Sequence, residues 1–134
     1  MNKILLVFFV FCFILINFVG CHMRYDHQKS IQNNTCDTII FYFSDISYFA
    51  NMKDNIVICY PYSENIFEYV VIDYAKDNPC HPYMENRTEL IITVTTNSGR
   101  ALKKDIKKNS NWRCAENSRA LWKVVFEINE EDLE

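Results

Sequence analysis

Hydrophobic and polar positions alternate along several short segments of the chain, as they do in β-strands with one buried face. The clearest alternation runs through residues 89–96. Leu90, Ile92 and Val94 share one face there. Residues 121–128 repeat the pattern, with bulky apolar side chains on one face and charged ones on the other. The six segments predicted as strands are residues 38–43, 55–60, 66–75, 89–96, 101–106 and 121–128.

The segments between the predicted strands favour an antiparallel arrangement. A turn at residues 97–99 is expected to reverse the chain and make a hairpin of the strands on either side of it. Ser44 is a suitable N-cap for one short helix over residues 44–52. The sequence therefore predicts a mainly β fold: a small antiparallel β-sandwich or barrel-like domain, stabilised by disulfides, with one short helix.

Residues 1–21 have the pattern of a signal peptide. Lys3 precedes a run of sixteen residues with a single polar member, which is shorter than the roughly 20 apolar residues of a membrane span. Cleavage after Cys21 is expected to leave a secreted chain that begins at His22. Two membrane-anchored alternatives stay open: an uncleaved signal anchor through residues 4–21, and a lipoprotein acylated on Cys21.

The remainder of the chain has the length of one domain. Residues 22–35 are polar and show no periodicity, so we expect a flexible leader there. A single β-rich domain is predicted for residues 36–129. The acidic residues 130–134 are expected to form a frayed tail.

Export changes the interpretation of the cysteines and of two asparagines. Removal of residues 1–21 leaves four cysteines, an even number that predicts two disulfides in an oxidising compartment, with three possible pairings. These four are Cys36, Cys59, Cys80 and Cys114. Asn33 and Asn86 each begin an Asn-x-Thr motif in a polar segment expected on the surface, so both are candidate N-glycosylation sites.

Charge is unevenly distributed along the chain. The chain carries 14 basic and 17 acidic residues, a net charge of -3, which argues against nucleic acid as a partner. The basic residues concentrate after Gly99 and define a candidate anion-binding surface of Arg100, Lys103, Lys104, Lys107, Lys108 and Arg113. Two alternatives are a lysine-rich edge that prevents aggregation and an acidic tail that folds back to neutralise the segment.

Aromatic residues are dense between Phe41 and Tyr83. Tyrosine combines an apolar ring with a hydroxyl group, so such a cluster is able to line a binding surface. Tyr60 and Tyr62, on either side of Pro61 at a strand end, are the candidate binding pair. The alternative is that these aromatics are ordinary core and strand residues.

Motifs for catalysis are few. Gly99 is the single glycine after the signal peptide, which excludes glycine-dependent phosphate loops and serine elbows. The histidines lack zinc-site spacing, so no metal or cofactor is expected. We expect a secreted, non-enzymatic protein that binds an extracellular protein, glycan or lipid. The alternative is a small secreted hydrolase acting on an anionic substrate. A flat sheet face would favour the binder, and a hollow with His81 or paired carboxylates beside the basic segment would favour the hydrolase.

Overall fold

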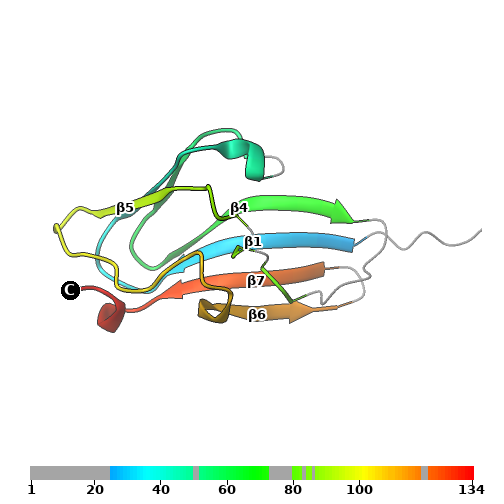
Figure 1. Ribbon diagram of the computed structural model, residues 1–134. Coiled ribbons are helices and arrows are strands. Elements are labelled where there is room, and N and C mark those ends of the chain that lie inside the picture. Colours follow the sequence, from blue (N-terminus) through cyan, green and yellow to red (C-terminus); the bar gives the residue numbers. More distant parts are fainter. Residues whose placement is uncertain (1–24, 50–51, 73–79, 83, 86, 119–120) are drawn as a thin grey trace, which may run out of the picture.

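The computed structural model describes residues 25–49, 52–72, 80–82, 84–85, 87–118 and 121–134 (Figure 1). Its strands are β1(Tyr25–Asn33), β2(Ile39–Phe43), β3(Ile56–Cys59), β4(Ser63–Ile72), β5(Ile92–Thr96), β6(Trp112–Asn117) and β7(Leu121–Ile128). They form a four-stranded sheet of order β4-β1-β7-β6 and a three-stranded sheet of order β3-β2-β5. Neighbouring strands are antiparallel except β1 and β7, which are parallel.

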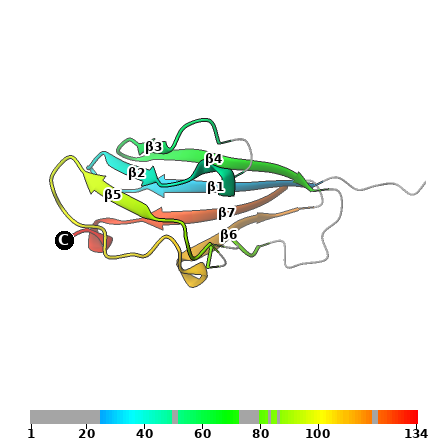
Figure 2. The ribbon, with the colours of Figure 1, turned by 45° about the horizontal axis from the view of Figure 1, so that its top comes forward.

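The two sheets pack as the layers of a sandwich (Figure 2). Aromatic rings from both sheets fill the space between them. Phe43 of the three-stranded sheet stacks on Phe67 of the four-stranded sheet at 5.7 Å, and Trp112 contacts Phe126 at 5.5 Å. Such pairs add stabilisation beyond the area that they bury. The predicted mainly β, sandwich-like fold is confirmed, and no closed barrel is present in the described part of the chain.

The predicted flexible leader at residues 22–35 is wrong, because residues 25–33 form β1. This strand lies between β4 and β7 in the four-stranded sheet. Its inward positions include His27 and Lys29, which are only 4% and 3% exposed. The polar sequence hid the alternation, since a charged side chain is rarely expected in a core. A tertiary ion pair to Glu68 makes this burial possible.

The predicted frayed tail at residues 130–134 is also wrong. The chain forms a 3-10 helix, η3(Glu130–Asp132), whose capping box joins Asn129 and Asp132. The next residue, Leu133, is buried and forms a β-bridge with Leu102. An apolar residue in the penultimate position therefore fastens the acidic segment to the domain.

The other predicted elements agree with the structure to different degrees. The strands predicted at 38–43, 55–60 and 121–128 correspond to β2, β3 and β7. β4 begins three residues before the strand predicted at 66–75, and residues 73–75 of that prediction lie outside the described residues. β5 begins three residues after the start of the strand predicted at 89–96. Residues 101–106 form no strand; the turn at Gly99 (φ +79°) leads instead into the single bridge at Leu102.

The short helix predicted at 44–52 is reduced to one 3-10 turn, η1(Ile46–Tyr48), which Asp45 caps instead of Ser44. Another 3-10 turn, η2(Asn109–Asn111), precedes β6. Residues 50–51 lie outside the described part of the chain. Within that part, no helix is long and apolar enough to cross a membrane. The predicted signal peptide also lies outside the described residues.

One of the two predicted disulfides is present, between Cys80 and Cys114. Cys36 and Cys59 are free thiols, so the prediction that all four cysteines pair is wrong. Cys59 points into the core from β3, whereas Cys36 is exposed in the loop before β2. Burial raises the pKa of the Cys59 thiol to about 12, which keeps it protonated at neutral pH.

Candidate functional site

The outer surface of the three-stranded sheet carries no charged side chain. We call its six outward-facing residues the small-sheet face: Ile40, Tyr42, Ile56, Ile58, Thr93 and Thr95. Phe41 and Val57, which alternate with them, are buried in the core. The outward orientation therefore follows from the two-residue period of a strand.

The strand register arranges this face in two rows. Tyr42 lies opposite both Ile56 and Thr93. Ile40 lies opposite both Ile58 and Thr95. Between 38% and 43% of each of Tyr42, Ile56 and Ile58 is exposed to solvent. The result is a flat, β-branched and aromatic surface that offers hydroxyl groups as its only polar side-chain atoms.

The outer surface of the four-stranded sheet is different. Lys123 on β7 forms an ion pair with Glu64 on β4 at 2.7 Å. Arg113 on β6 pairs with Glu127 on β7. The same sheet also exposes Ile66, Tyr69 and Val71 on β4, so its outer surface mixes charged and apolar side chains. Only the smaller sheet presents an uncharged outer face.

A shallow hollow of about 400 Å³ adjoins the small-sheet face where β3 and β4 lie side by side as edge strands. Its apolar lining includes Met52, Ile56, Ile58, Tyr60, Ile66 and Phe67. Asn65 Nδ2 donates a hydrogen bond to the carbonyl oxygen of Ile58 at 3.0 Å and joins the two edges. Lys53 and Asp54 also line the hollow, so the uncharged surface is confined to the sheet itself.

Tyr60 and Tyr62, the tyrosines singled out in the sequence, lie in the turn between β3 and β4 and are 62% and 74% exposed. Tyr62 adopts a left-handed backbone conformation (φ 54°). The carbonyl oxygen of Tyr60 accepts hydrogen bonds from Asn33 Nδ2 at 3.1 Å and from Ser63 Oγ at 2.7 Å. The structure places Tyr60 at the hollow, beside Ile58 and Ile66.

Asn33 is fully buried, so its interpretation as a surface glycosylation site is wrong for the folded protein. Its Nδ2 contacts the carbonyl oxygens of Asp37, Cys59 and Tyr60 at 2.7 to 3.1 Å. Its Oδ1 accepts from the backbone N–H and the hydroxyl of Thr35. Asn33 therefore joins β1 to the ends of the other sheet. Asn86, the other candidate, lies outside the described residues.

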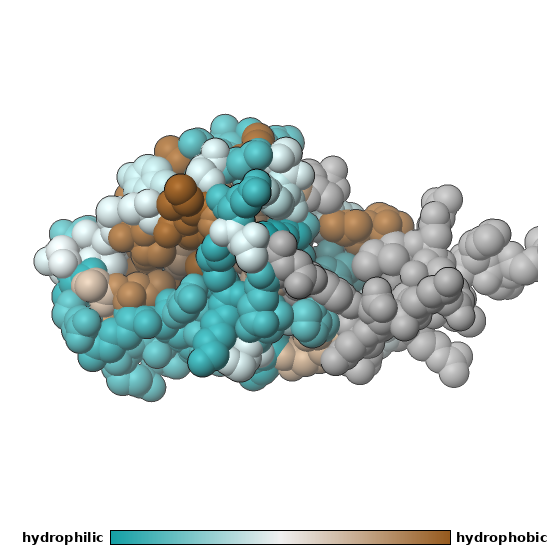
Figure 3. Space-filling view, viewed as in Figure 1, coloured by the Kyte–Doolittle hydropathy of each residue, from teal (hydrophilic) through white to brown (hydrophobic). Residues whose placement is uncertain are grey.

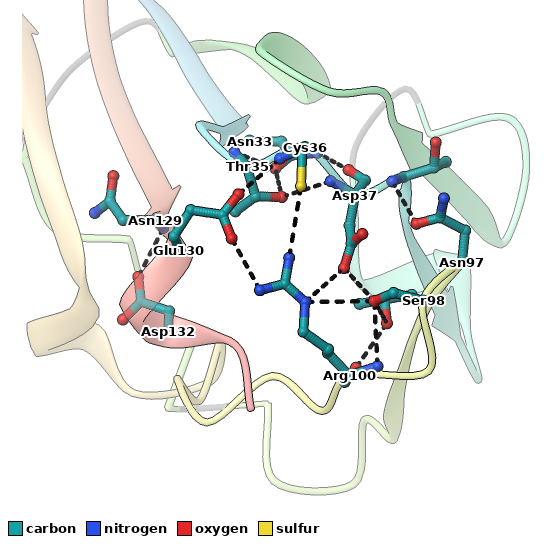
Figure 4. Close-up of polar contacts among 12 residues, drawn as sticks. Asn33, Thr35, Cys36, Asp37, Asn97, Ser98, Arg100, Asn129, Glu130 and Asp132 are labelled. Carbon is teal, nitrogen blue, oxygen red and sulfur yellow. Dashed lines mark hydrogen bonds and ion pairs between the residues drawn. The ribbon is translucent and has the colours of Figure 1, made fainter.

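Arg100 is held in a network that connects three segments (Figure 4). Its guanidinium donates to Asp37 Oδ2 at 3.0 Å and to Glu130 Oε2 at 2.9 Å, and Nη2 lies 3.9 Å from Cys36 Sγ. Hydrogen bonds hold the pKa of Asp37 below its ordinary value, and the bond from Ser98 has a larger effect than the bond from Arg100. Two carboxylates thus neutralise the arginine.

Four of the other five basic candidates are similarly engaged. Lys103 pairs with Glu134 at 3.3 Å and Lys104 with Asp132 at 3.6 Å. Lys107 Nζ donates to two backbone carbonyls, those of residues 88 and 90, at 3.1 and 2.9 Å. Arg113 pairs with Glu127, and Lys108 is exposed at the surface. The acidic C-terminal segment folds back on the basic one, and Figure 3 shows the resulting hydrophilic lower edge beside hydrophobic residues near β5.

A further hollow, of about 310 Å³, contains Glu85 and Asp105 beside Lys107 and Lys108. Glu85 Oε1 accepts from the backbone N–H of Asn109 at 2.9 Å. Asp105 Oδ1 accepts from the backbone N–H of Lys107 at 2.8 Å. Both carboxylates therefore hold the loop in place.

His81 Nε2 lies 3.4 Å from Asn109 Nδ2. No group of three or more His, Cys, Asp or Glu side chains suited to a metal ion occurs among the residues that the structure describes. The small-sheet face, the strongest candidate, was missed from sequence. Its signal was present in residues 38–43 and 55–60, where apolar residues occupy both faces of a strand.

Comparisons with protein-family models, with curated proteins and with solved structures found no match to this chain.

Proposed function

We propose that the protein is exported and acts outside the cell as a non-enzymatic binding module, with the small-sheet face as its contact surface for another protein. The observation that carries this proposal is the absence of charge from all six outward positions of a three-stranded sheet. The opposite sheet of the same domain carries cross-strand ion pairs.

The chemistry of the face selects the class of partner. A flat surface offers no enclosed volume to a small ligand, and its lack of charge gives an anionic glycan or headgroup nothing to bind. A charged group placed against the face would lose water without gaining a partner. The matching surface is therefore another protein face, apolar and uncharged at its centre, with Tyr60 and Tyr62 extending the contact at one end.

The test is affinity capture from the extracellular fluid of the source with three baits: the wild-type protein, Ile58→Lys and Val71→Lys. Ile58 and Val71 are 39% and 50% exposed, on the outer faces of different sheets. A genuine partner is retained by the wild type and by Val71→Lys and is lost from Ile58→Lys. Equal retention on all three baits would contradict the proposed surface.

Export is supported by the apolar segment within residues 1–21, and the disulfide between Cys80 and Cys114 is compatible with it. Mass spectrometry of the N-terminus of the expressed protein separates the possibilities. A chain that begins at His22 in the medium supports secretion. Retained Met1, or lipid on Cys21, would indicate a membrane-anchored form of the same domain.

A further inference from the structure

β3 is an edge strand, and within the described residues its one strand partner is β2. The backbone N–H of Phe43 on β2 donates to the carbonyl oxygen of Asn55 at 2.8 Å. Because antiparallel strands bond through every second residue, Val57 and Cys59 also bond to β2. The N–H and C=O groups of Ile56 and Ile58 therefore point the other way, toward the hollow between β3 and β4.

One hydrogen bond confirms this direction. Asn65 Nδ2 on β4 donates to the carbonyl oxygen of Ile58 at 3.0 Å, so the outer edge of β3 already accepts a donor from outside its sheet. No other group in the described part of the chain bonds to this edge. The N–H and C=O of Ile56 and the N–H of Ile58 are left open, on residues that are 43% and 39% exposed.

The hollow of about 400 Å³ gives room beside this edge. Its lining includes Val57 and Phe67, which are almost buried, and Ile66, which is 49% exposed. Alternate side chains of a strand point to opposite faces. A strand added to β3 would therefore place every second side chain over this apolar lining and the others on the small-sheet face.

The sequence of β3 does nothing to prevent such pairing. Edge strands usually carry a charge, a proline or a bulge that blocks the addition of another strand. The four residues of β3 are Ile-Val-Ile-Cys, without charge or proline, and the pairing with β2 is regular. Lys53 and Asp54 line the hollow just before β3 begins, and their charges are of opposite sign. An added segment therefore needs no net charge.

The small-sheet face is too small to hold a partner by face-to-face packing alone. Strands lie about 4.8 Å apart and rise about 3.3 Å per residue, so a patch three strands wide and about four residues long covers roughly 200 Å². A stable interface buries about 800 Å² on each partner. An added strand gains affinity from main-chain hydrogen bonds, which do not depend on the area of the face.

We propose that β3 binds an extended, uncharged segment of the partner protein as a fourth strand of the smaller sheet. Apolar side chains at alternate positions of that segment occupy the hollow, and its backbone bonds to Ile56 and Ile58. This inference rests on the proposed function and specifies how the partner is held.

Selection of peptides from a displayed library of random twelve-residue sequences, with the purified protein as bait, tests the added strand. Ile56→Thr and Ile56→Pro both remove the isoleucine side chain, but only proline removes the N–H that faces the hollow. An edge strand tolerates proline where its N–H points outward. The selected peptides should be uncharged, with apolar residues at alternate positions, and should bind Ile56→Pro about tenfold more weakly than Ile56→Thr.

Amide hydrogen exchange of the wild type covers the case in which Ile56→Pro fails to fold. In the free protein the amide of Ile56 should exchange faster than that of Val57, which bonds to β2. A selected peptide at saturation should slow the exchange of Ile56. If the amide of Ile56 is as protected as that of Val57 without peptide, the edge is occupied within the chain and the proposal is overturned.

The remaining outcomes separate the added strand from the function on which it rests. Peptides that bind Ile56→Pro as well as Ile56→Thr, but not Ile58→Lys, would overturn the strand and leave the small-sheet face as the contact. A library without binders, or with peptides that bind all variants alike, would also overturn the strand, and the capture experiment would still decide the face. A wild-type dimer in sedimentation that Ile56→Pro converts to a monomer would identify the occupant as a second copy of this chain and overturn its assignment to another protein.

Discussion

Lys29 on β1 lies directly opposite Glu68 on β4, and their side chains form an ion pair inside the sandwich. Burial of the pair lowers the pKa of Lys29, and the attraction of Glu68 opposes that shift. Buried pairs contribute little net stability when intact, but removal of one partner leaves an uncompensated charge. The two partners are not equivalent here, because Glu68 also contacts Arg87.

This asymmetry predicts different results for the two halves of the pair. Glu68→Gln leaves both Lys29 and Arg87 without a carboxylate and should lower the free energy of unfolding by about 3–5 kcal/mol. Lys29→Met leaves Glu68 with Arg87 as a partner and should cost clearly less. Urea unfolding of both variants measures the difference.

Arg113→Met is the matched surface control, because its pair with Glu127 is largely exposed and should contribute about 1 kcal/mol or less. If Lys29→Met proves as destabilising as Glu68→Gln, Arg87 does not share the carboxylate in solution.

The stability of the protein should fall on acidification because of His27. The pKa of His27 is lowered to about 4, mainly because the imidazole is buried and to a lesser extent because the positive charge of Lys29 is nearby. The unfolded chain, with a pKa near 6.5, binds the proton more readily, so stability is lost as pH falls from about 6.5 to 4. The loss should reach about 3 kcal/mol at pH 4.

Urea unfolding between pH 7 and pH 4 measures this loss. The carboxylates whose pKa values are lowered, Asp37 and Glu130 among them, titrate at the acid end of this range or below it. The difference between wild type and His27→Gln isolates the histidine. Parallel pH curves for the two proteins would show that His27 has an ordinary pKa.

Sequence reasoning succeeded where a strand buries apolar side chains, as in β2, β3 and β7. It failed for β1, whose inward positions near its start are His27 and Lys29. Their burial depends on Glu68, about forty residues away in the chain, and on a covering segment that carries Arg87. Local periodicity contains no information about such a partner, so the sequence pattern predicts a flexible leader where the structure has a strand.

The candidate sites show the same limit. The basic segment was prominent in the sequence, but the acidic residues that neutralise it, such as Glu130 and Asp132, follow it by some thirty residues. One of the sequence alternatives, an acidic tail that folds back, describes this arrangement. The small-sheet face could not be predicted, because apolar residues on both sides of a strand normally indicate that both sides are buried. The sequence pattern does not show that one side of this sheet faces solvent.

Asn33 should be important for stability and not for glycosylation. Asn33→Asp replaces a donor by an acceptor facing the carbonyl oxygens of Asp37, Cys59 and Tyr60, and Asn33→Ala removes the donor. We expect losses of about 2–3 kcal/mol for alanine and more for aspartate. Asn34→Ala is the neighbouring control, because Asn34 is only part-buried and has a single side-chain partner. Equal losses at positions 33 and 34 would contradict this role.

The cysteines allow a prediction that separates the observed pairing from the two-disulfide alternative. In the protein cleaved after Cys21, iodoacetamide should modify exposed Cys36 in the native state and buried Cys59 only after unfolding. Mass spectrometry should therefore count one adduct on the native protein and two on the unfolded protein. Cys36→Ser should lower each count by one. If the unreduced wild type takes up no label even in denaturant, Cys36 and Cys59 are joined in a disulfide and the observed pairing is contradicted.

The disulfide between Cys80 and Cys114 predicts an effect on stability. The double variant Cys80→Ser/Cys114→Ser should lower the free energy of unfolding by about 4 kcal/mol, since the bridge spans 34 residues.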